Sequence, residues 1–418
     1  MPHAKPPARA VARIGSAAII IAIALLALAV VWNERIVSTI FNKGLPITPV
    51  FIIIVATMRK LIVLVAITIF IIGILLRKYR IPIARWMTRH RDTLTNIIVL
   101  VCTMLALLII GEITARAMLG KTTFDAGGPA HKDQTAQITY NSYGFRDREF
   151  PVERPTGTVR VLALGDSFTF GHGIENDSLP WPKALERMLN ENAADGTIYE
   201  VINTGQNGYQ PKDELTTLER AAPLGPDIVL LGYFYNDAAT DDTLRELAEP
   251  PSTWSQLKSG THLLLFSHSY LYGFLVVRWE MTRINLGLKE SYPERMNNVY
   301  RLHAGELSMH KEQLMAIRSR AETIGAEFVL VIIPANYDFN DYPLMDGEQF
   351  MRRFCEESRT ACIDLLDTVR DEDYRKTRLN EYDAHPSEYG HTVLARAVME
   401  SPEFRAAMVK TSAKRQKI

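Results

Sequence analysis

The first group in this chain that could do chemistry is a serine directly after an apolar run. In VLALGDSFTFGHG (161–173), Gly165, Asp166 and Ser167 follow a predicted buried strand. A serine at a strand-to-helix turn can expose its hydroxyl as a nucleophile and keep its own N–H free as a donor. The simpler interpretation is that Ser167 caps the following helix, since serine is a favoured N-cap residue.

A histidine near the C-terminus offers the base that a serine nucleophile requires. His385 lies in YDAHPSEYGH (382–391), and Asp383 two residues earlier is the candidate to orient it, with Glu381 as the second choice. The order of nucleophile, base and acid along the chain does not affect the geometry of a triad. These residue types therefore favour acyl transfer through a serine, although a His-Pro pair alone more often indicates a helix-entry loop.

Two further segments offer donors for the negative oxygen that develops in acyl transfer. The stretch NTGQNG (203–208) ends in Gly208, whose backbone N–H can approach a ligand closely because no Cβ intervenes. The stretch FYND (234–237) supplies the side-chain amide of Asn236. Together with the N–H of Ser167, these groups would form a three-donor oxyanion hole. An Asn-Asp pair taken alone would more often indicate a turn.

All of these candidates lie beyond strands of one predicted sheet. Nearly continuous apolar runs alternate with segments of helical periodicity, which is typical of a parallel sheet covered on both faces. Ligands of such sheets bind at the carboxyl ends of the strands, so the candidates should meet in one crevice. The predicted strands are 158–164, 199–203, 226–234, 327–334 and 361–366, and the main predicted helices are 181–191, 213–222, 307–325 and 387–399.

Four short blocks, in this order, resemble the SGNH (GDSL) hydrolase superfamily: GDSFT, the glycine of NTGQNG, the asparagine of FYND and the His-Pro of DAHPS. The resemblance covers about residues 140–405, and NSYGFRDREFP before the first block is similar to the lead-in of membrane-linked members. It implies a flavodoxin-like three-layer α/β/α fold, and ester hydrolysis or acyl transfer by serine. By the same resemblance, Ser167 is the nucleophile, Gly208 and Asn236 are the oxyanion donors, and His385 is the base.

The last block departs from the usual pattern of the family, which is Asp-x-x-His. Here Asp383 lies two residues before His385. Asp-x-His occurs in polysaccharide O-acetyltransferase relatives, so Asp383 remains the expected acid. The first hypothesis is then a serine esterase or deacylase and the second an O-acyltransferase with the same triad. A non-catalytic glycan-binding protein is a third hypothesis, which the complete set of site residues disfavours. Four neighbouring residues are expected to have structural roles: His172, His391, Asp166 and Asp237.

The N-terminal region, residues 1–113, has the composition of a membrane segment. Three runs are long and apolar enough to span a bilayer, and none has a polar face that would suit a water-exposed helix. The stretch ITPVFIIIVATM (47–58) is too short to span, and we expect it to be interfacial or re-entrant. The predicted spans are 14–32, 58–76 and 94–111, which together make a multi-pass anchor.

The distribution of Lys and Arg predicts how this anchor is oriented. Up to Arg116 the chain has 14 Lys and Arg against 3 Asp and Glu. The basic residues gather at the N-terminus and in RKYRIPIARWMTRHRD (77–92), so the positive-inside rule places both segments in the cytoplasm. With three spans, everything after about residue 114 is then extracytoplasmic, at the outer face of the cell membrane. A fourth span would invert this orientation.

The rest of the chain is expected to divide into a lead-in (114–155), an SGNH-like domain (156–405) with a helical insert at about 243–305, and a basic tail (406–418). The insert contains THLLLFSHSYLYGFLVVRWEM (261–281), which could be a cap over the active-site edge or an apolar surface for acyl chains or the bilayer. From its location, the expected substrate is an acyl ester of an envelope glycan or lipid. A transferase would also need a separate acyl-donor partner in the membrane.

Composition argues against other classes of protein. After Arg116 the chain has 33 Lys and Arg against 44 Asp and Glu, so no nucleic-acid partner is expected. The sequence has no Walker A, dinucleotide-binding glycine or HExxH pattern, and neither a cofactor nor a metal is expected. Cys355 and Cys362 could pair outside the cytoplasm, or remain two packed thiols, whereas Cys102 lies in a predicted span.

Overall fold

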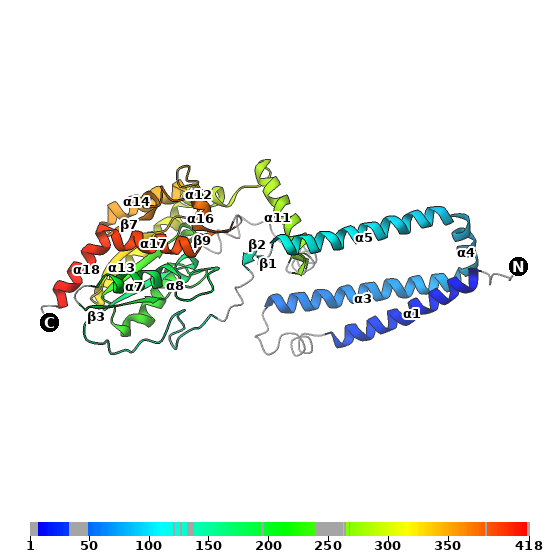
Figure 1. Cartoon of the computed structure of the whole chain (residues 1–418), viewed down its shortest axis with the longest axis horizontal. Coiled ribbons are helices and arrows are strands. Elements are labelled where there is room, and N and C mark those ends of the chain that lie inside the picture. Colours follow the sequence, from blue (N-terminus) through cyan, green and yellow to red (C-terminus); the bar gives the residue numbers. More distant parts are fainter. Residues whose placement is uncertain are drawn as a thin grey trace. The chain divides into compact units, whose positions relative to one another are not determined.

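The computed structural model describes residues 7–32, 49–119, 122–125, 128–131, 138–193, 196–239, 262, 265–266, 268–380 and 383–415. The chain forms two compact units, which are treated separately below. The first unit comprises Met1–Gly127 and Pro251–Arg278, and the second comprises Gly128–Pro250 and Trp279–Ile418. Helix and strand labels follow Figure 1.

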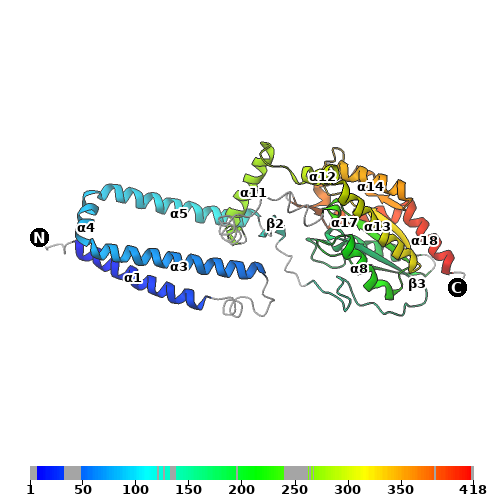
Figure 2. The same ribbon diagram turned by 180° about the vertical axis from the view of Figure 1, so that it is seen from behind.

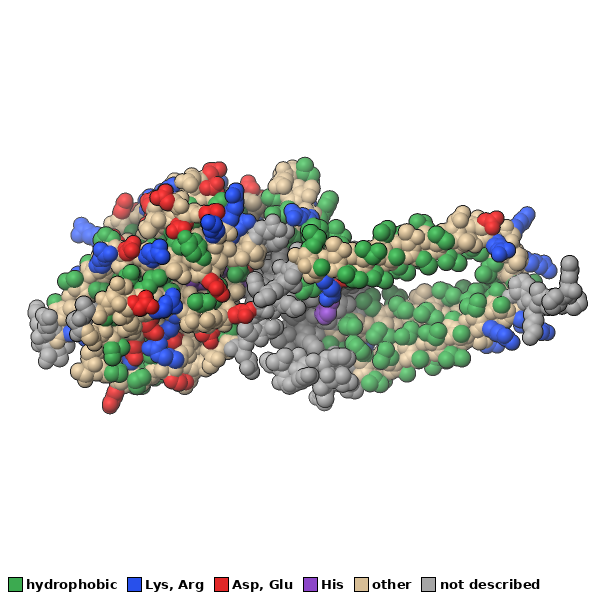
Figure 3. Space-filling model, viewed as in Figure 1, with side chains coloured by type: hydrophobic (Ala, Val, Ile, Leu, Met, Phe, Trp, Pro, Cys, Tyr) green, Lys and Arg blue, Asp and Glu red, His purple; other side chains and the backbone are tan. Residues whose placement is uncertain are grey.

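Long apolar helices make up most of the first unit. They are α1 (Pro7–Val31), α3 (Pro49–Lys78) and α5 (Arg91–Leu119), with the short α4 (Arg80–Arg89) before α5. Within them, Ala8–Val31, Met58–Lys78 and Arg91–Met118 are long and apolar enough to cross a membrane. Apolar side chains cover these helices along their length, and basic side chains gather near α4, as Figure 3 shows. The three apolar segments expected from the sequence are confirmed as helices.

The stretch 47–58, expected to be interfacial or re-entrant, is not a separate element from residue 49 onward. From Pro49 onward this stretch is the beginning of α3, which continues without a break to Lys78. The physical reason is that the intervening Arg59 and Lys60 are good helix formers, so nothing there ends the helix. Helices α1 and α3 pack closely at two glycines, since a Cβ on Gly15 would lie 2.8 Å from the carbonyl oxygen of Gly73.

The end of α5 is linked to the start of α11 (Tyr270–Asn285), which lies within the expected insert. The Glu112 carboxylate accepts hydrogen bonds from Ser269 Oγ (2.8 Å) and from the backbone N–H groups of Tyr270 (3.1 Å) and Leu271 (3.0 Å). An acid at a helix N-terminus satisfies unpaired N–H groups and complements the helix dipole. The earlier part of the insert, from 240 to 261, lies outside the described residues.

A parallel sheet forms the centre of the second unit. Its strands lie in the order β4-β3-β5-β6-β7, and every neighbouring pair is parallel. Counted along the chain this order is 2-1-3-4-5, that of flavodoxin-like folds, in which the switch point lies between the first and third strands. The strands are β3 (Thr158–Gly165), β4 (Ile198–Asn203), β5 (Ile228–Tyr233), β6 (Glu327–Ile332) and β7 (Cys362–Asp364).

Helices cover both faces of this sheet, as the two opposite views in Figures 1 and 2 show. On one face, α7 (Trp181–Glu191) packs against α17 (Glu388–Glu400) and β4, while α18 (Pro402–Arg415) packs on β6. On the other, α8 (Pro211–Ala221) packs against α13 (Ala304–Thr323). The three-layer α/β/α fold expected from the sequence is therefore confirmed.

The expected basic tail differs from what the structure shows. Residues 406–415 are the second half of α18, because Phe404, Ala407 and Thr411 recur at helical spacing and are buried against the domain. Lys414 pairs with Glu327 at the start of β6 (2.6 Å). The basic side chains therefore attach the last helix to the sheet.

Shorter elements and one disulfide complete the described structure. Cys355, in α14 (Met345–Ser358), forms a disulfide with Cys362 in β7. The remaining elements are β1 (Thr122–Asp125), β2 (Gly128–His131), α6 (Ser167–Phe170), η2 (Ala222–Leu224), η3 (Tyr235–Ala238), α12 (Tyr292–Leu302), α15 (Leu365–Thr368), α16 (Tyr374–Thr377), β8 (Arg378–Asn380) and β9 (Asp383–Pro386).

The lead-in before β3 is tied to the turn that follows α6. Arg146 is only 1% exposed and donates hydrogen bonds to the carbonyl oxygens of Gly171 (2.9 Å) and Ile174 (2.5 Å). The neighbouring Asp147 is also buried and accepts a hydrogen bond from the N–H of Asn203 at the end of β4 (2.9 Å). The lead-in thus supports two of the loops at the carboxyl edge of the sheet.

Candidate active site

The turn between β3 and α6 places Ser167 at the carboxyl edge of the sheet. Asp166 is the N-cap of α6, and its Oδ1 accepts a hydrogen bond from the N–H of Phe168 (2.9 Å). The alternative that Ser167 caps the helix is therefore wrong, because the neighbouring carboxylate does so. As the first residue of α6, Ser167 has an N–H without an acceptor inside the helix. That N–H is available to a ligand.

Three glycines make room for α6 against the strands. A Cβ added to Gly165 or Gly232 would lie 2.3 Å from Thr169 Oγ1, and one added to Gly205 would lie 2.4 Å from the N of Phe170. Gly165 also has φ +147°, which L side chains rarely adopt. The glycines before Ser167 and after β4 are thus needed for the close approach of the helix that carries the serine.

The structure brings Ser167, His385 and Asp383 into one hydrogen-bonded chain, although Ser167 is more than 200 positions from the other two in sequence. Ser167 Oγ lies 2.8 Å from His385 Nε2, and His385 Nδ1 lies 2.5 Å from Asp383 Oδ1. His385 and Asp383 both lie in β9, where the N–H of His385 also donates to Asp383 Oδ1 (2.9 Å). The Asp-x-His spacing therefore suits a short strand in which the acid accepts from both the ring and the backbone of the histidine.

The environment of Asp383 keeps its carboxylate charged. Burial by itself would raise its pKa, but the hydrogen bond and the charge of His385 outweigh burial, and the pKa is lowered from its ordinary value. The ring of His385 also packs on the ring of Phe168, with centroids 4.7 Å apart. The second choice for the acid, Glu381, lies outside the described residues.

The two expected oxyanion donors lie on the loops after β4 and β5. Gly208 is exposed with φ +75°, and no atom of the described residues lies within 4 Å of where its Cβ would be, so its backbone is accessible to a ligand in this part of the structure. Asn236 lies in η3, and its side chain is near enough to Asp166, beside the serine, to lower the pKa of that carboxyl against the rise that burial causes. Its amide group has two N–H bonds that can donate to a ligand.

Beneath this edge lies a group of buried acids that we call the acid cluster: Asp166, Glu214 and Asp237. All three are buried, and neither carboxylate oxygen of Glu214 has a hydrogen-bond partner among the described residues. Burial raises the pKa of Asp166 and raises those of Glu214 and Asp237 strongly, and the negative charges of the cluster raise the latter two further. Burial and the neighbouring carboxylates therefore favour the protonated forms of Glu214 and Asp237.

The other histidines near the site divide into two kinds. His391 is fully buried, accepts a hydrogen bond from the N–H of Trp181 (3.1 Å), and burial lowers its pKa to about 3, so it is a neutral structural group as expected. His172, which is also expected to be structural, lies beside the proposed triad: its Nε2 is 3.8 Å from Asp383 Oδ2 and its ring packs on His385. Nothing in the spacing of the sequence predicts this contact, since His172 and His385 come from opposite ends of the domain.

Fold and site thus define an α/β/α protein with a serine, a histidine and a carboxylate hydrogen-bonded in series at the edge of a parallel sheet. A family model described as the GDSL-like Lipase/Acylhydrolase family matches residues 163–393, which is more than half of the chain. The chain belongs to this family, as its four sequence blocks indicate. Comparison with curated proteins gives no match.

Several solved structures are similar to the chain at low sequence identity. TesA is 16% identical, with 59% of this chain and 99% of that chain covered and a TM-score of 0.37. An acetylxylan esterase, Axe2 from Geobacillus stearothermophilus, is 17% identical over 59% and 94% of the two chains (TM-score 0.36). The psychrotrophic esterase EstA from Pseudoalteromonas sp. is 13% identical over 58% and 95% (TM-score 0.34). The family assignment depends on the family model and not on these similarities.

Proposed function

We propose that the chain is a membrane-anchored, extracytoplasmic serine esterase or deacylase that uses Ser167, His385 and Asp383. The observation that carries this proposal is the hydrogen-bonded chain from Ser167 Oγ to His385 Nε2 (2.8 Å) and from His385 Nδ1 to Asp383 Oδ1 (2.5 Å). With the Nδ1 proton shared with the acid, Nε2 is the free base that faces the serine.

The geometry supports a two-step acyl transfer. Ser167 Oγ attacks the carbonyl carbon of the ester while His385 Nε2 takes its proton. The N–H groups of Ser167 and Gly208 and the amide of Asn236 would bind the resulting oxyanion. His385 then gives the proton to the departing alcohol, which leaves an acyl-serine. A water molecule, deprotonated by His385, attacks this acyl group and releases the acid and free Ser167.

The proposed location comes from the first unit. Three helices with the length and composition of membrane spans precede the hydrolase domain. The basic residues at the N-terminus and around α4 favour a cytoplasmic position for both segments, so the domain after the third span would be outside. An acyl ester on an envelope glycan or lipid is the substrate class that this location favours.

One observation favours an O-acyltransferase as the second candidate. The acid and base are spaced as Asp-x-His, which resembles polysaccharide O-acetyltransferases, and the same acyl-serine could pass its acyl group to a hydroxyl of an acceptor instead of water. This candidate requires an acyl donor, supplied by a separate membrane partner. Product analysis of acetyl-ester turnover with and without an envelope glycan would distinguish the two.

A fluorophosphonate probe on the detergent-solubilised full chain tests the nucleophile. We expect covalent labelling of the wild type and none of Ser167→Ala, because the probe reacts only with an activated serine. Ser178, exposed on the same domain, gives the control variant Ser178→Ala, which should label like the wild type. Equal labelling of Ser167→Ala and wild type would rule out the proposed nucleophile.

A further inference from the structure

His172 is held firmly beside the triad, although the proposed reaction does not use it. It follows α6, and its N–H donates to the carbonyl oxygen of Ser167 (3.0 Å). Glycines with positive φ flank it, Gly171 at +85° and Gly173 at +77°. The buried Arg146 binds the carbonyl of Gly171 and so fixes the turn. The side chain therefore has a defined place and does not sample the surface freely.

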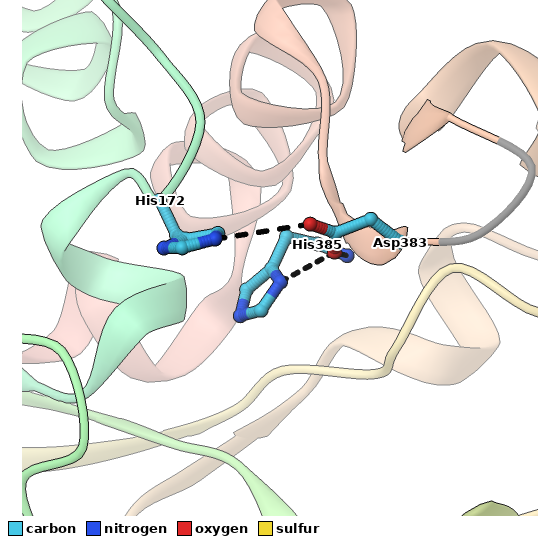
Figure 4. A group of neighbouring side chains, drawn as sticks. All are labelled: His172, Asp383 and His385. Atoms are coloured by element: carbon cyan, nitrogen blue, oxygen red, sulfur yellow. Dashed lines mark hydrogen bonds and ion pairs between the residues drawn. The ribbon is translucent and has the colours of Figure 1, made fainter. Parts of the chain in front are cut away.

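The side chains of His172, Asp383 and His385 converge, as Figure 4 shows. His172 Nε2 faces Asp383 Oδ2 at 3.8 Å, while His385 Nδ1 is 2.5 Å from the other oxygen, Oδ1. The two imidazole rings pack with centroids 4.5 Å apart. One donor atom from each of the three residues lies within 4.8 Å of the other two. A single carboxylate is thus shared by two histidines.

We propose that His172, Asp383 and His385 form an inhibitory site for a divalent cation, with Zn²⁺ as the ion whose chemistry fits best. Two imidazole nitrogens and one carboxylate oxygen are a common set of zinc ligands, with a fourth position left for water. Ligand atoms about 2.0–2.1 Å from a tetrahedral zinc ion lie roughly 3.3 Å apart. The observed distances, 3.8 Å from His172 Nε2 to Asp383 Oδ2 and 2.5 Å from His385 Nδ1 to Asp383 Oδ1, lie on either side of that spacing.

The site is open to a cation from solvent. The side chains of His172, Asp383 and His385 are 23%, 13% and 24% exposed, so each is anchored in the domain and still accessible. The negative charge of Asp383 favours a cation, and the nitrogen ligands favour zinc over calcium or magnesium, which prefer sets made of oxygen atoms.

Zinc would inhibit because two of its ligands belong to the proposed triad, and the inference therefore rests on the proposed function. Bound to His385 Nδ1, the ion replaces the proton that this nitrogen shares with Asp383, and that proton leaves to bulk water. The ring is then held by the metal and turned from the orientation in which Nε2 accepts the proton of Ser167. Removal of the ion by a chelator restores the triad.

Direct binding to an inactive variant separates the cation site from catalysis. The full chain carrying Ser167→Ala, in detergent and stripped with EDTA, is titrated with ZnCl₂ in a calorimeter. We expect one saturable site per chain. Adding His172→Gln should weaken binding by about tenfold or more, since even changes beyond the direct ligands of a metal cost about 10–100-fold. In the wild type, esterase turnover should fall with Zn²⁺ and recover with EDTA.

His303 provides a matched control for non-specific binding to histidine. Its Nδ1 lies 3.5 Å from Glu306 Oε1, with similar exposure but no second histidine in the pair, so His303→Gln should leave the zinc affinity unchanged. His172→Glu, which keeps a ligand atom, should bind zinc more tightly than His172→Gln. Absence of saturable binding, or equal affinity with and without His172→Gln, would overturn the cation site. Absence of Ser167-dependent turnover in metal-free enzyme would instead overturn the proposed function.

Discussion

At the scale of single residues, the acid of the proposed triad determines which nitrogen of His385 carries a proton. Asp383 accepts from His385 Nδ1 at 2.5 Å. In Asp383→Asn the amide can present its N–H to the ring and so favour the wrong tautomer. We expect kcat to fall about 10²–10⁴-fold with a small change in KM, because the interaction matters most in the transition state.

Steady-state kinetics on a soluble acetyl ester measures this effect. The exposed Asp371 gives the control Asp371→Asn, which should keep the wild-type kcat. A kcat for Asp383→Asn within a few fold of the wild type would show that another group orients His385.

A second residue-scale prediction concerns Glu214 and pH. Burial raises the pKa of Glu214 well above the ordinary 4.5, so the folded state keeps a proton that the unfolded state loses. Stability is therefore fully present below about 4.5 and decreases as pH rises from there through the raised pKa. Glu214→Gln removes this dependence, and at pH 8 it should stabilise the domain by on the order of 1 kcal/mol, or about 2–4 °C in Tm.

Thermal unfolding of the wild type and of Glu214→Gln at pH 5 and pH 8 tests the direction of this pH dependence. The gain in Tm of Glu214→Gln over wild type should be larger at pH 8 than at pH 5. A gain that is larger at pH 5, or a loss at pH 8, would mean that Glu214 is ionised and paired in the folded protein.

At the scale of elements, the sequence predicts the sheet well and the functional turn less well. Strands buried on both faces are nearly continuous apolar runs, and the predicted strand 158–164 matches β3 (Thr158–Gly165) to within one residue. The boundaries of the last helices were harder to predict, because basic residues at 406–418 conceal the buried positions of α18. Which residue caps α6 could not be predicted either, since Asp166 and Ser167 are both good caps and only the backbone geometry separates them.

The close approach of α6 to the sheet gives a prediction at this scale. A Cβ at position 205 would lie 2.4 Å from the N of Phe170 and 2.8 Å from the carbonyl carbon of Thr169. These are backbone atoms of α6, so the helix itself must move. We expect Gly205→Ala to destabilise the domain by about 3 kcal/mol or more and to abolish labelling of Ser167 by the fluorophosphonate.

A glycine in open space is the control for this substitution. Gly305 lies in α13 with nothing within 4 Å of its Cβ position, and Gly305→Ala should be neutral or slightly stabilising, since alanine favours helices. Wild-type Tm and labelling for Gly205→Ala would show that the β4 loop can shift without disturbing the serine.

At the scale of the whole molecule, the site depends on contacts that a sequence pattern cannot show. The four blocks point to Ser167, Gly208, Asn236 and His385: the first three follow strands of the parallel sheet, and His385 lies in β9. His172 and Glu214 carry no such signal. A lone histidine in a turn belongs to no spacing pattern. An acid in the first turn of α8 is expected there in any case, because it interacts favourably with the helix dipole. Only the folded chain shows that His172 lies beside Asp383 and that Glu214 is buried without a hydrogen-bond partner in the described part of the structure.

The distribution of charge and the cysteine pair lead to one prediction for the whole chain. With three potential spans and basic flanks at the N-terminus and α4, the positive-inside rule predicts that the hydrolase domain lies outside the cytoplasm. The disulfide between Cys355 and Cys362 agrees, since disulfides persist in oxidising compartments. A reporter enzyme that is active only outside the cytoplasm, fused after Ile418, should therefore be active, and one fused after Arg89 should be silent. The reverse pattern would mean that the predicted orientation is inverted, either by an even number of spans or by an N-terminus outside the cytoplasm, and would place the proposed triad in the cytoplasm, away from any envelope ester.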